Sequence, residues 1–465
     1  MLMWRKTLLE STSKLLLRNV KNHEVIQQYR KFHASKRREI VPIIIAVVGA
    51  VGIRYTYRAI VQMEEDWQDY EDALEEYNRK NNINNNNGAS TTKNKHIIGI
   101  DLGSVNLRVS HSTPKNTAEI IINSNGARST PNVSLLEDNN KISFGNFAHE
   151  KILEQPNRVF QPFLLLQNDS DELLKLQQTS STTSLEYILP TMLNNIVEDA
   201  KNQLSLVDEV HPIVTYPPMD SYEKEYKDIL SKWGVTNYTV IPEPIAAIEA
   251  ARHYNLVPST DEPILLLDMG GKTMTVSIVA GSDILYSRSY PDVMNGDVIL
   301  QKIIHLCTEG QNNYTSDAMA MQRIYNAANS AVLELSNQKR VDINIPYISM
   351  DIKTQTPKHL QVGIGQLVLE QSIIQETSIR SKMVQVLTDC LTESNLNPFQ
   401  LSTILAHGGS CASPITQKVI TTSLSQLAGD AFVQERLVLT KLNDNTTLFQ
   451  ELVVLGASLY GQKNK

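Results

Sequence analysis

The chain has few cysteines for its length, and this scarcity limits the kinds of site it can hold. Its 465 residues include only Cys307, Cys390 and Cys411, which lie far apart. Because no C-x-x-C pair occurs, the sequence favours neither a disulfide framework nor a metal site. The ten histidines show no metal-ligand spacing. His407 precedes two glycines and could meet a ligand, although a structural role is the commoner one for such a residue.

The sequence also lacks an excess of positive charge and the best-known phosphate-binding pattern. Its net charge of −7 argues against general nucleic-acid binding, which needs many lysines and arginines. The P-loop pattern G-x-x-x-x-G-K-[ST] is absent. The uncharged run 40–53 has fourteen residues, fewer than the ~20 that cross a bilayer. The sequence therefore predicts no nucleic-acid partner, and any nucleotide site must use another kind of loop.

A strand, an aspartate, a glycine turn and a second strand follow one another twice in the chain. In 264–279 an apolar run ends at Asp268 and two glycines follow; 96–110 has the same layout around Asp101. One such unit alone is equally well explained as a turn between core strands. Two copies so far apart predict two similar half-domains. Glycine turns let backbone N–H groups approach an anion, and the aspartates suit hydrated Mg²⁺, so we expect a phosphate site.

The N-terminal part predicts a targeting segment and a membrane anchor. Residues 1–39 contain ten lysines and arginines against three acids, as in mitochondrial presequences; a basic cytosolic arm is the alternative. The run 40–61 reaches spanning length if its two arginines extend to the interface, and it predicts one transmembrane helix, or else a short apolar part of the leader. We expect a single-pass protein of the mitochondrial inner membrane with its domain in the intermembrane space.

Two polar segments separate this run from the folded domain, which is expected over 96–462. Residues 62–80 predict an acidic amphipathic helix that either docks a protein partner or is solvated, and the asparagine-rich 81–95 predicts a linker. The endoplasmic reticulum membrane is the main alternative location. It rests on five N-x-[ST] patterns, at Asn132, Asn168, Asn237, Asn313 and Asn445.

Periodicity and turn residues place further elements within the domain. Apolar spacing predicts helices over 185–205, 316–337 and 370–394. Glu243, between two prolines, either lies near Mg²⁺ and a water or complements the dipole of the helix that it begins. The strand near 401–406 leads to the turn 408–410, Gly-Gly-Ser, which suits the sugar or phosphates of a nucleotide.

The order of these motifs resembles the nucleotide-binding domain of the heat shock protein 70 family, in the actin-like ATPase superfamily. The resemblance covers about 97–461 and rests on GIDLGSVNLRVS (99–110), NGARSTPN (125–132), PEPIAAIEAA (242–251), LLLDMGGKTMTVSI (265–278), LAHGGSCASP (405–414) and LGASLYG (455–461). It implies an α/β fold of two lobes, built from duplicated ribonuclease H-like subdomains, with ATP or ADP and Mg²⁺ in the cleft.

The resemblance also assigns roles to individual residues. Asp101 and Asp268 would hold the hydration shell of Mg²⁺, and Glu243 would lie near the attacking water, so Glu243 and Asp268 are the catalytic candidates. The cofactor-binding candidates are Gly103, Ser104, Gly270, Gly271 and Thr273 at the phosphates, Gly408, Gly409 and Ser410 at the adenosine and phosphates, and Ser336 at the adenine.

Several positions depart from the family pattern. The family's catalytic lysine falls at Phe163, and a glycine of its second phosphate loop is Lys272. The family's arginine that stacks on the adenine falls at Ala412, and other charged family residues fall at Thr275, Asn329, Val332, Leu333 and Gln450. Because phosphoryl transfer needs positive charge at the phosphate oxygens, we expect weak hydrolysis or none. Lys272 replaces the missing lysine only if its side chain enters the cleft.

These observations leave three functions to compare. The first is a membrane-anchored, chaperone-like ATP-binding protein that assists protein assembly, folding or import at the mitochondrial inner membrane. The second is a pseudo-ATPase scaffold or regulator that neither hydrolyses nor firmly binds ATP. The third, a small-molecule kinase, is disfavoured because no sugar-binding insertion is recognisable. Since the chain ends at Lys465, we expect no peptide-binding domain and no direct peptide clamp.

Overall fold

The computed structural model describes most of the chain after residue 95. The described residues are 96–113, 117–138, 141–152, 154–162, 185–205, 210–218, 222–231, 238–309, 317–350, 355–376, 378–439 and 446–463. They belong to one compact unit, Lys93–Lys465, and everything below concerns this unit. The predictions for 1–39, 40–61, 62–80, 81–95 and Phe163 fall outside the described residues.

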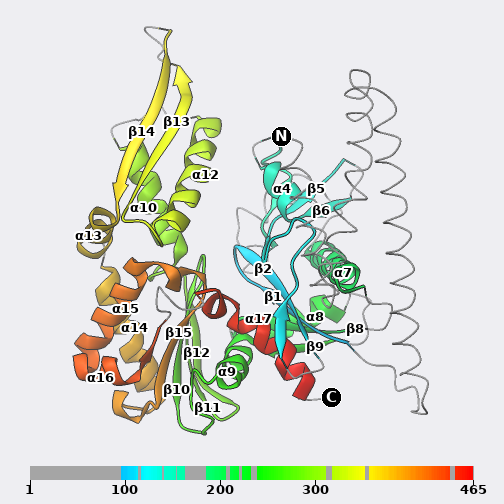
Figure 1. Ribbon diagram of the computed structural model, residues 1–465, viewed down its shortest axis with the longest axis vertical. Coiled ribbons are helices and arrows are strands. Elements are labelled where there is room, and N and C mark those ends of the chain that lie inside the picture. Colours follow the sequence, from blue (N-terminus) through cyan, green and yellow to red (C-terminus); the bar gives the residue numbers. More distant parts are fainter. Residues whose placement is uncertain are drawn as a thin grey trace, which may run out of the picture. The chain divides into compact units, whose positions relative to one another are not determined.

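Two β-sheets with the same strand order form the framework (Figure 1). The first has the order β3-β2-β1-β8-β9, with β4 also beside β2, and the second has the order β12-β11-β10-β15-β16. The strands of the first are β1 (His96–Leu102), β2 (Asn106–Ser112), β3 (Ala118–Ile120), β4 (Thr130–Pro131), β8 (Val210–Tyr216) and β9 (Thr239–Pro242). Those of the second are β10 (Ile264–Met269), β11 (Met274–Ala280), β12 (Asp283–Tyr290), β15 (Thr403–His407) and β16 (Leu437–Val438).

Each sheet begins with an antiparallel hairpin and continues with parallel strands. The hairpins are β1–β2 and β10–β11, and β8 and β15 run parallel to β1 and β10 respectively. This duplication confirms the mixed α/β class and is consistent with the predicted actin-like ATPase fold. It also brings the two strand–aspartate–glycine segments to equivalent positions.

Helices cover both faces of each sheet because the central strands are apolar on both sides. The outer face of the first sheet packs on α7 (Leu185–Leu204) and α8 (Tyr222–Ser231). That of the second packs on α14 (Ile379–Glu393) and α15 (Pro414–Ala428). The inner faces share one core with α9 (Glu243–His253) and α17 (Thr446–Lys463), which lie between the sheets (Figure 1).

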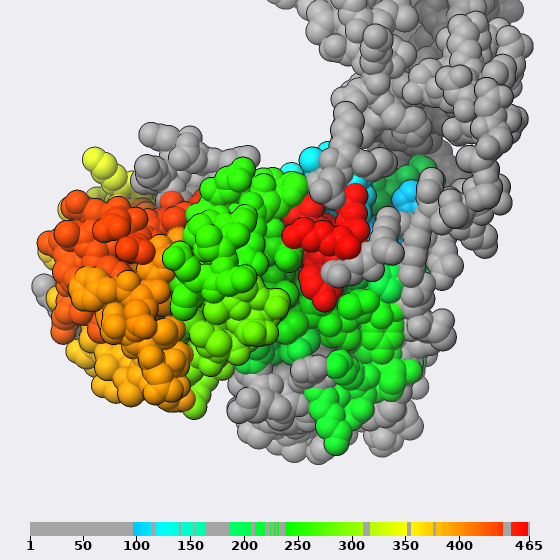
Figure 2. All heavy atoms as spheres, turned by 90° about the horizontal axis from the view of Figure 1, so that it is seen from below, coloured from blue at the N-terminus to red at the C-terminus, as the bar shows by residue number. Residues whose placement is uncertain are grey.

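The crossing of α9 and α17 joins the two halves through backbone contact. A Cβ at Gly456 would lie 1.7 Å from the carbonyl oxygen of Ala246, so only glycine fits here. The small residues of α9 make this approach possible, because four of its buried positions are alanines. Seen from below, the C-terminal residues reach the surface beside the green segments of the unit (Figure 2).

Smaller elements complete the unit. The sheet β6-β5-β7 comprises β5 (Ser134–Leu136), β6 (Ile142–Phe144) and β7 (Val159–Phe160), next to α4 (Asn146–Glu150). The hairpin of β13 (Arg340–Met350) and β14 (Pro357–Gly365) packs with α10 (Gly296–Thr308), α12 (Ala318–Glu334) and α13 (Gln366–Glu376). The remaining helices are η1 (Pro398–Gln400), η2 (Gly409–Ala412) and α16 (Asp430–Arg436).

The predicted helices are confirmed in two cases and wrong in one. α7 and α12 match the predictions for 185–205 and 316–337. The predicted single helix over 370–394 is instead two helices, α13 and α14, separated near Ser378. Their buried positions keep a similar spacing, so apolar periodicity alone does not reveal the break.

The prediction of a membrane as partner, reached through a single span, is wrong. Among the described residues, no helix combines the length and apolar character needed to cross a bilayer. The longest, α7, carries Glu198, Asp199 and Lys201 near its end.

Candidate functional site: a cleft lined by two glycine hairpins

The first hairpin is held open by an asparagine from a neighbouring loop. Asn132, which is buried, donates from Nδ2 to the carbonyl oxygen of Gly103 at 2.8 Å. Its backbone N–H donates to the carbonyl of Val105 at 2.9 Å. These bonds fix the turn that follows Asp101, so Ser104 and Val105 lie at a defined tip.

The second hairpin is fixed from three sides. The N–H of Gly270 closes the turn on the carbonyl of Thr273 at 2.9 Å. Asn295, which caps α10 and is fully buried, donates to the carbonyl of Lys272 at 3.0 Å. The hydroxyl of Ser410 donates to the carbonyl of Gly270 at 2.7 Å. The turn is thus preorganised by elements far from it in sequence.

The two hairpin tips meet. The N–H of Lys272 donates to the hydroxyl of Ser104 at 3.3 Å, and the side chain of Val105 lies against Gly271. Equivalent turns of the two halves therefore face one another.

A cleft of about 430 Å³ lies between these turns. All the described residues predicted for the site line it: Asp101, Gly103, Ser104, Glu243, Gly270, Gly271, Thr273, Asp268, Ser336, Gly408, Gly409 and Ser410. Phe163 lies outside the described residues. The structure thus brings together residues that are separated by up to 309 positions in the chain.

Three carboxyl groups gather at the closed end of the cleft. Burial raises the pKa of Asp101 to about 6, although Arg108 opposes the rise; Asp268 adds to it. Burial also raises the pKa of Glu243 well above its ordinary value, and the charges of Asp101 and Asp268 raise it further. Burial is the main cause of both shifts and repulsion between the carboxyl groups adds to it; a bound cation would relieve this repulsion.

This donor set fits a hydrated Mg²⁺ better than a directly bound ion. Among the described residues, no three histidine, cysteine, aspartate or glutamate side chains are close enough to hold a metal. Mg²⁺ keeps several waters and commonly binds through one or two carboxylates together with phosphates. Asp101 and Asp268 would hold such an ion, and it would supply positive charge to phosphate oxygens.

The third turn of the cleft follows β15. Gly408 has φ +95° and ψ 165°, a conformation that side chains disfavour, and a Cβ there would lie 2.4 Å from Oδ1 of Asp268. His407 is buried, with Nδ1 3.8 Å from the same oxygen. Burial lowers the pKa of His407, while Asp268 opposes this. Its neutral imidazole and Gly408 together restrict the Asp268 carboxylate.

The far end of the cleft has a different character. It is lined mainly from α12, by Tyr325, Asn329, Val332 and Leu333, with Asn337 just after this helix and Ala412 at the end of η2. Leu333 is 68% exposed. The charged lining residues of the described part are Asp101, Arg108, Glu243, Asp268, Lys272 and Asp297, and none of these lies on α12 or η2.

Sequence reasoning missed two charged residues of the cleft. Asp297 lies in the first turn of α10, and Arg108 lies on β2. Arg108 reaches the cleft because it lies directly opposite Asp101 in the β1–β2 hairpin and therefore shares its face. The sequence alone does not give this register.

The two sheets have equivalent strand orders, and each presents a glycine hairpin to one cleft lined by carboxyl groups. This arrangement defines a duplicated α/β protein with a cleft suited to phosphate groups. Comparison with known proteins gives the family. The family described as "Hsp70 protein" matches residues 97–432, and the chain belongs to the Hsp70 family.

Individual relatives are distant and longer. "Chaperone protein DnaK" of Thermosipho africanus (strain TCF52B) is 27% identical over 340 residues, which cover 70% of this chain and 55% of the relative. "Chaperone protein dnaK" of Guillardia theta is 26% identical over 395 residues, covering 78% and 59% respectively. The chain therefore spans little more than half the length of these relatives.

Proposed function

We propose that the cleft binds ATP or ADP with Mg²⁺ and that the chain is a chaperone-like protein that assists protein assembly, folding or import. The gathering of all the described candidate residues around one preorganised cleft supports this proposal most directly. The two relatives are named as chaperones, and the chain shares their family.

We further propose that hydrolysis is slow or absent. Transfer of a phosphoryl group requires positive charge at the phosphate oxygens and a correctly charged residue beside the attacking water. In the described lining of the cleft, the acidic residues outnumber the two basic ones, Arg108 and Lys272, so little positive charge is available at the phosphate oxygens. The apolar far end supports the alternative, a pseudo-ATPase scaffold or regulator, because it offers no charged side chain to a base.

We propose a mitochondrial location on the basis of the basic leader 1–39 alone. The endoplasmic reticulum is the alternative, and a gel shift after glycosidase treatment would support it. Asn132 is a poor acceptor in the folded protein, because it is buried and bonded to Gly103. The glycosidase test therefore depends on the other four patterns, at Asn168, Asn237, Asn313 and Asn445.

Thermal unfolding of the 465-residue protein tests nucleotide binding. A ligand at 100 times its Kd stabilises by about 2.7 kcal/mol, so Mg-ATP should raise the midpoint by about 2–4 °C. Chelation of Mg²⁺ should remove most of this rise. Asp268→Asn should abolish it, whereas Asp283→Asn, at an exposed position of β12, should preserve it. No rise at millimolar Mg-ATP would overturn the proposal.

Phosphate release after single-turnover mixing separates the two versions of this function. Slow release identifies a switching ATPase. Binding without release identifies the scaffold. Absence of both binding and release excludes nucleotide from either role.

A further inference from the structure

Arg108 is placed opposite a carboxylate of the cleft by the register of the first sheet. In the β1–β2 hairpin, Arg108 is the direct partner of Asp101. Directly opposite residues of an antiparallel pair project from the same face. The next residues along, Leu102 and Leu107, are also partners, and both are buried in the core on the other face. Alternation thus sends Arg108 to the side on which Asp101 lines the cleft.

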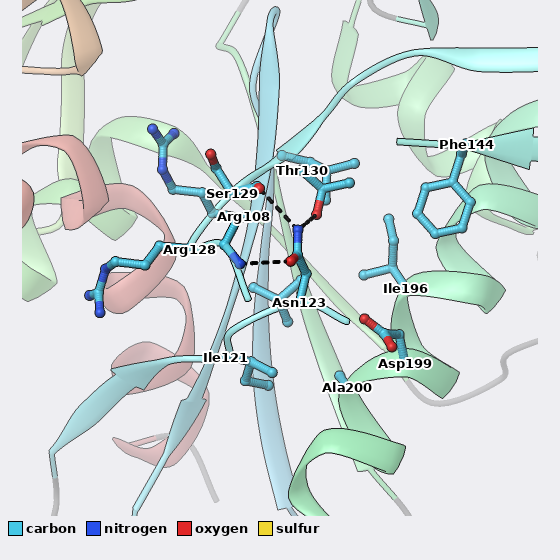
Figure 3. A pocket seen from close by; sticks show the side chains of 13 residues that line it. Arg108, Ile121, Asn123, Arg128, Ser129, Thr130, Phe144, Ile196, Asp199 and Ala200 are labelled. Atoms are coloured by element: carbon cyan, nitrogen blue, oxygen red, sulfur yellow. Dashed lines mark hydrogen bonds between the residues drawn. The ribbon is translucent and has the colours of Figure 1, made fainter. Parts of the chain in front are cut away.

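The guanidinium of Arg108 is uncommitted. The Arg108 side chain forms no hydrogen bond or ion pair with another described residue, although its charge does lower the pKa of Asp101. A nearby arginine differs: Arg128 donates from Nε and Nη2 to the two carboxylate oxygens of Glu451, each at 2.7 Å. Figure 3 shows the guanidinium groups of both arginines pointing away from Phe144 and Ile196.

The small cavity in Figure 3 does not account for Arg108. It has a volume of about 30 Å³, which suits at most a water molecule. The large cleft, which Arg108 also lines, is therefore the space that its charged end can serve.

We propose that Arg108 is the phosphate-binding cation that the first half of the cleft supplies. This inference rests on the proposed function, and it names the residue that makes the cleft accept a charged phosphate chain. The cleft lining has four carboxylates, Asp101, Glu243, Asp268 and Asp297, against the two cations Arg108 and Lys272. A nucleoside triphosphate adds further negative charge, which Mg²⁺ only partly offsets.

Arginine suits this task because its planar group donates two parallel hydrogen bonds to phosphate oxygens. Its position opposite Asp101 places one cation next to the carboxylate that would hold hydrated Mg²⁺. Phosphate would thus be bound by Arg108 and by the ion together. The inference also predicts that adenosine, which lacks phosphate, gains nothing from Arg108.

The test measures dissociation constants of Mg-ATP, Mg-ADP and adenosine by calorimetry with the 465-residue protein. Loss of a charge-assisted hydrogen-bonding group should weaken Mg-ATP and Mg-ADP about 10- to 100-fold in Arg108→Gln. Adenosine should change less than about 2-fold. Arg108→Lys keeps the charge without the planar group and should give an intermediate value. Arg380→Gln, an exposed arginine of α14 outside the cleft, is the matched control and should bind as the native protein does.

The outcomes separate the inference from the function on which it rests. If the native protein binds Mg-ATP and Arg108→Gln binds it equally well, the inference is wrong and the proposed function stands. If adenosine weakens as much as Mg-ATP, Arg108 acts through the fold and the inference is also wrong. If the native protein binds none of the three ligands, the proposed function itself fails.

A measurement on the native protein covers the case in which Arg108→Gln does not fold. An arginine-selective dicarbonyl reagent should modify Arg108, and mass spectrometry of its peptide reports the rate. Mg-ATP should slow this modification about 10-fold or more, a change of the same order as the affinity that Arg108→Gln should lose. Adenosine should leave the rate unchanged. Equal rates with and without Mg-ATP would overturn the inference.

Discussion

The two ends of the cleft differ in how much of a nucleotide site they contain. At the closed end, two hairpins of equivalent position bring glycine turns, three carboxylates and two cations together. At the far end, α12 and Ala412 contribute apolar, phenolic and amide side chains and no charge. Phosphate recognition uses backbone N–H groups and a few charges, which the hairpins fix. Recognition of a base would depend on side chains, and the described side chains of α12 that line the cleft carry no charge.

The largest expected effect comes from breaking the closed end at Gly408. Gly408→Ala places a side chain on a backbone conformation that costs about 1–3 kcal/mol. The new Cβ would also lie only 2.4 Å from Oδ1 of Asp268. We expect the free energy of unfolding to fall by at least that amount and Mg-ATP binding to disappear. Denaturant unfolding and calorimetry give the two values.

The neighbouring glycine provides the control. A Cβ at Gly409 would meet nothing within 4 Å, and its φ is not positive. Gly409→Ala should therefore change the free energy of unfolding by less than about 1 kcal/mol. Equal losses in the two variants would show that the turn at Gly408 is not the constraint.

The second prediction concerns the charge of Asp101. Its pKa is about 6 in the folded protein against an ordinary value of 3.8. Between these pH values the folded state binds more protons than the unfolded state, so stability falls as pH rises from about 4 to 6. Above pH 6 the whole penalty remains. Asp101→Asn should therefore be more stable than the native protein at pH 7.5, by about 1–3 kcal/mol, and lose Mg²⁺-dependent nucleotide binding.

Denaturant unfolding at pH 5 and 8 without Mg²⁺ measures this difference. Asp283→Asn, an exposed carboxyl removed from β12, should alter stability by less than about 0.5 kcal/mol at either pH. If Asp101→Asn is instead less stable than the native protein at pH 8, favourable contacts outweigh the cost of burying the Asp101 carboxylate, and the prediction is wrong.

The residues of the cleft differ in how far the sequence revealed them. Glycines and aspartates at strand ends mark turns and ligands by residue type alone, so the hairpin residues of the cleft were predictable. The duplicated sheets followed from the repeated unit. Arg108 was not predictable from its type, because a strand sequence does not state which partner each residue faces.

The family resemblance had indicated the uncharged positions Val332 and Leu333, but the exposure of Leu333 was not predicted. Val332 and Leu333 fit the apolar spacing of α12, and only the tertiary arrangement shows that Leu333 is exposed and lines the cleft. Likewise, local periodicity could not locate the break between α13 and α14. Packing against other elements, which a linear pattern does not contain, decided both features.

The third prediction sharpens the contrast by adding charge to the far end. The family resemblance places an adenine-stacking arginine at Ala412, which lines the cleft on η2. Ala412→Arg should tighten binding of adenosine and Mg-ATP alike, about 3- to 10-fold, through stacking on the base. Gln434→Arg, at an exposed position of α16, should leave both affinities unchanged. No change in Ala412→Arg would mean that the base does not reach this end.

The smallest expected effect distinguishes the two hairpins from each other. Lys272 occupies the tip of the second, where its backbone is bonded to Ser104 and Asn295. Lys272→Gln keeps those backbone bonds and removes only the charge. The ammonium group of lysine binds phosphate as a flexible point charge and lacks the planar pair of donors that arginine offers. We expect Mg-ATP to weaken about 2- to 3-fold, less than in Arg108→Gln.

Calorimetry on the two variants decides which half of the cleft supplies the effective cation. Lys224→Gln, an exposed lysine of α8, controls for the loss of one positive charge and should bind Mg-ATP as the native protein does. If Lys272→Gln costs more affinity than Arg108→Gln, the second hairpin holds the phosphates. The equivalence of the two halves would then extend to their backbones but not to the side chains that carry charge.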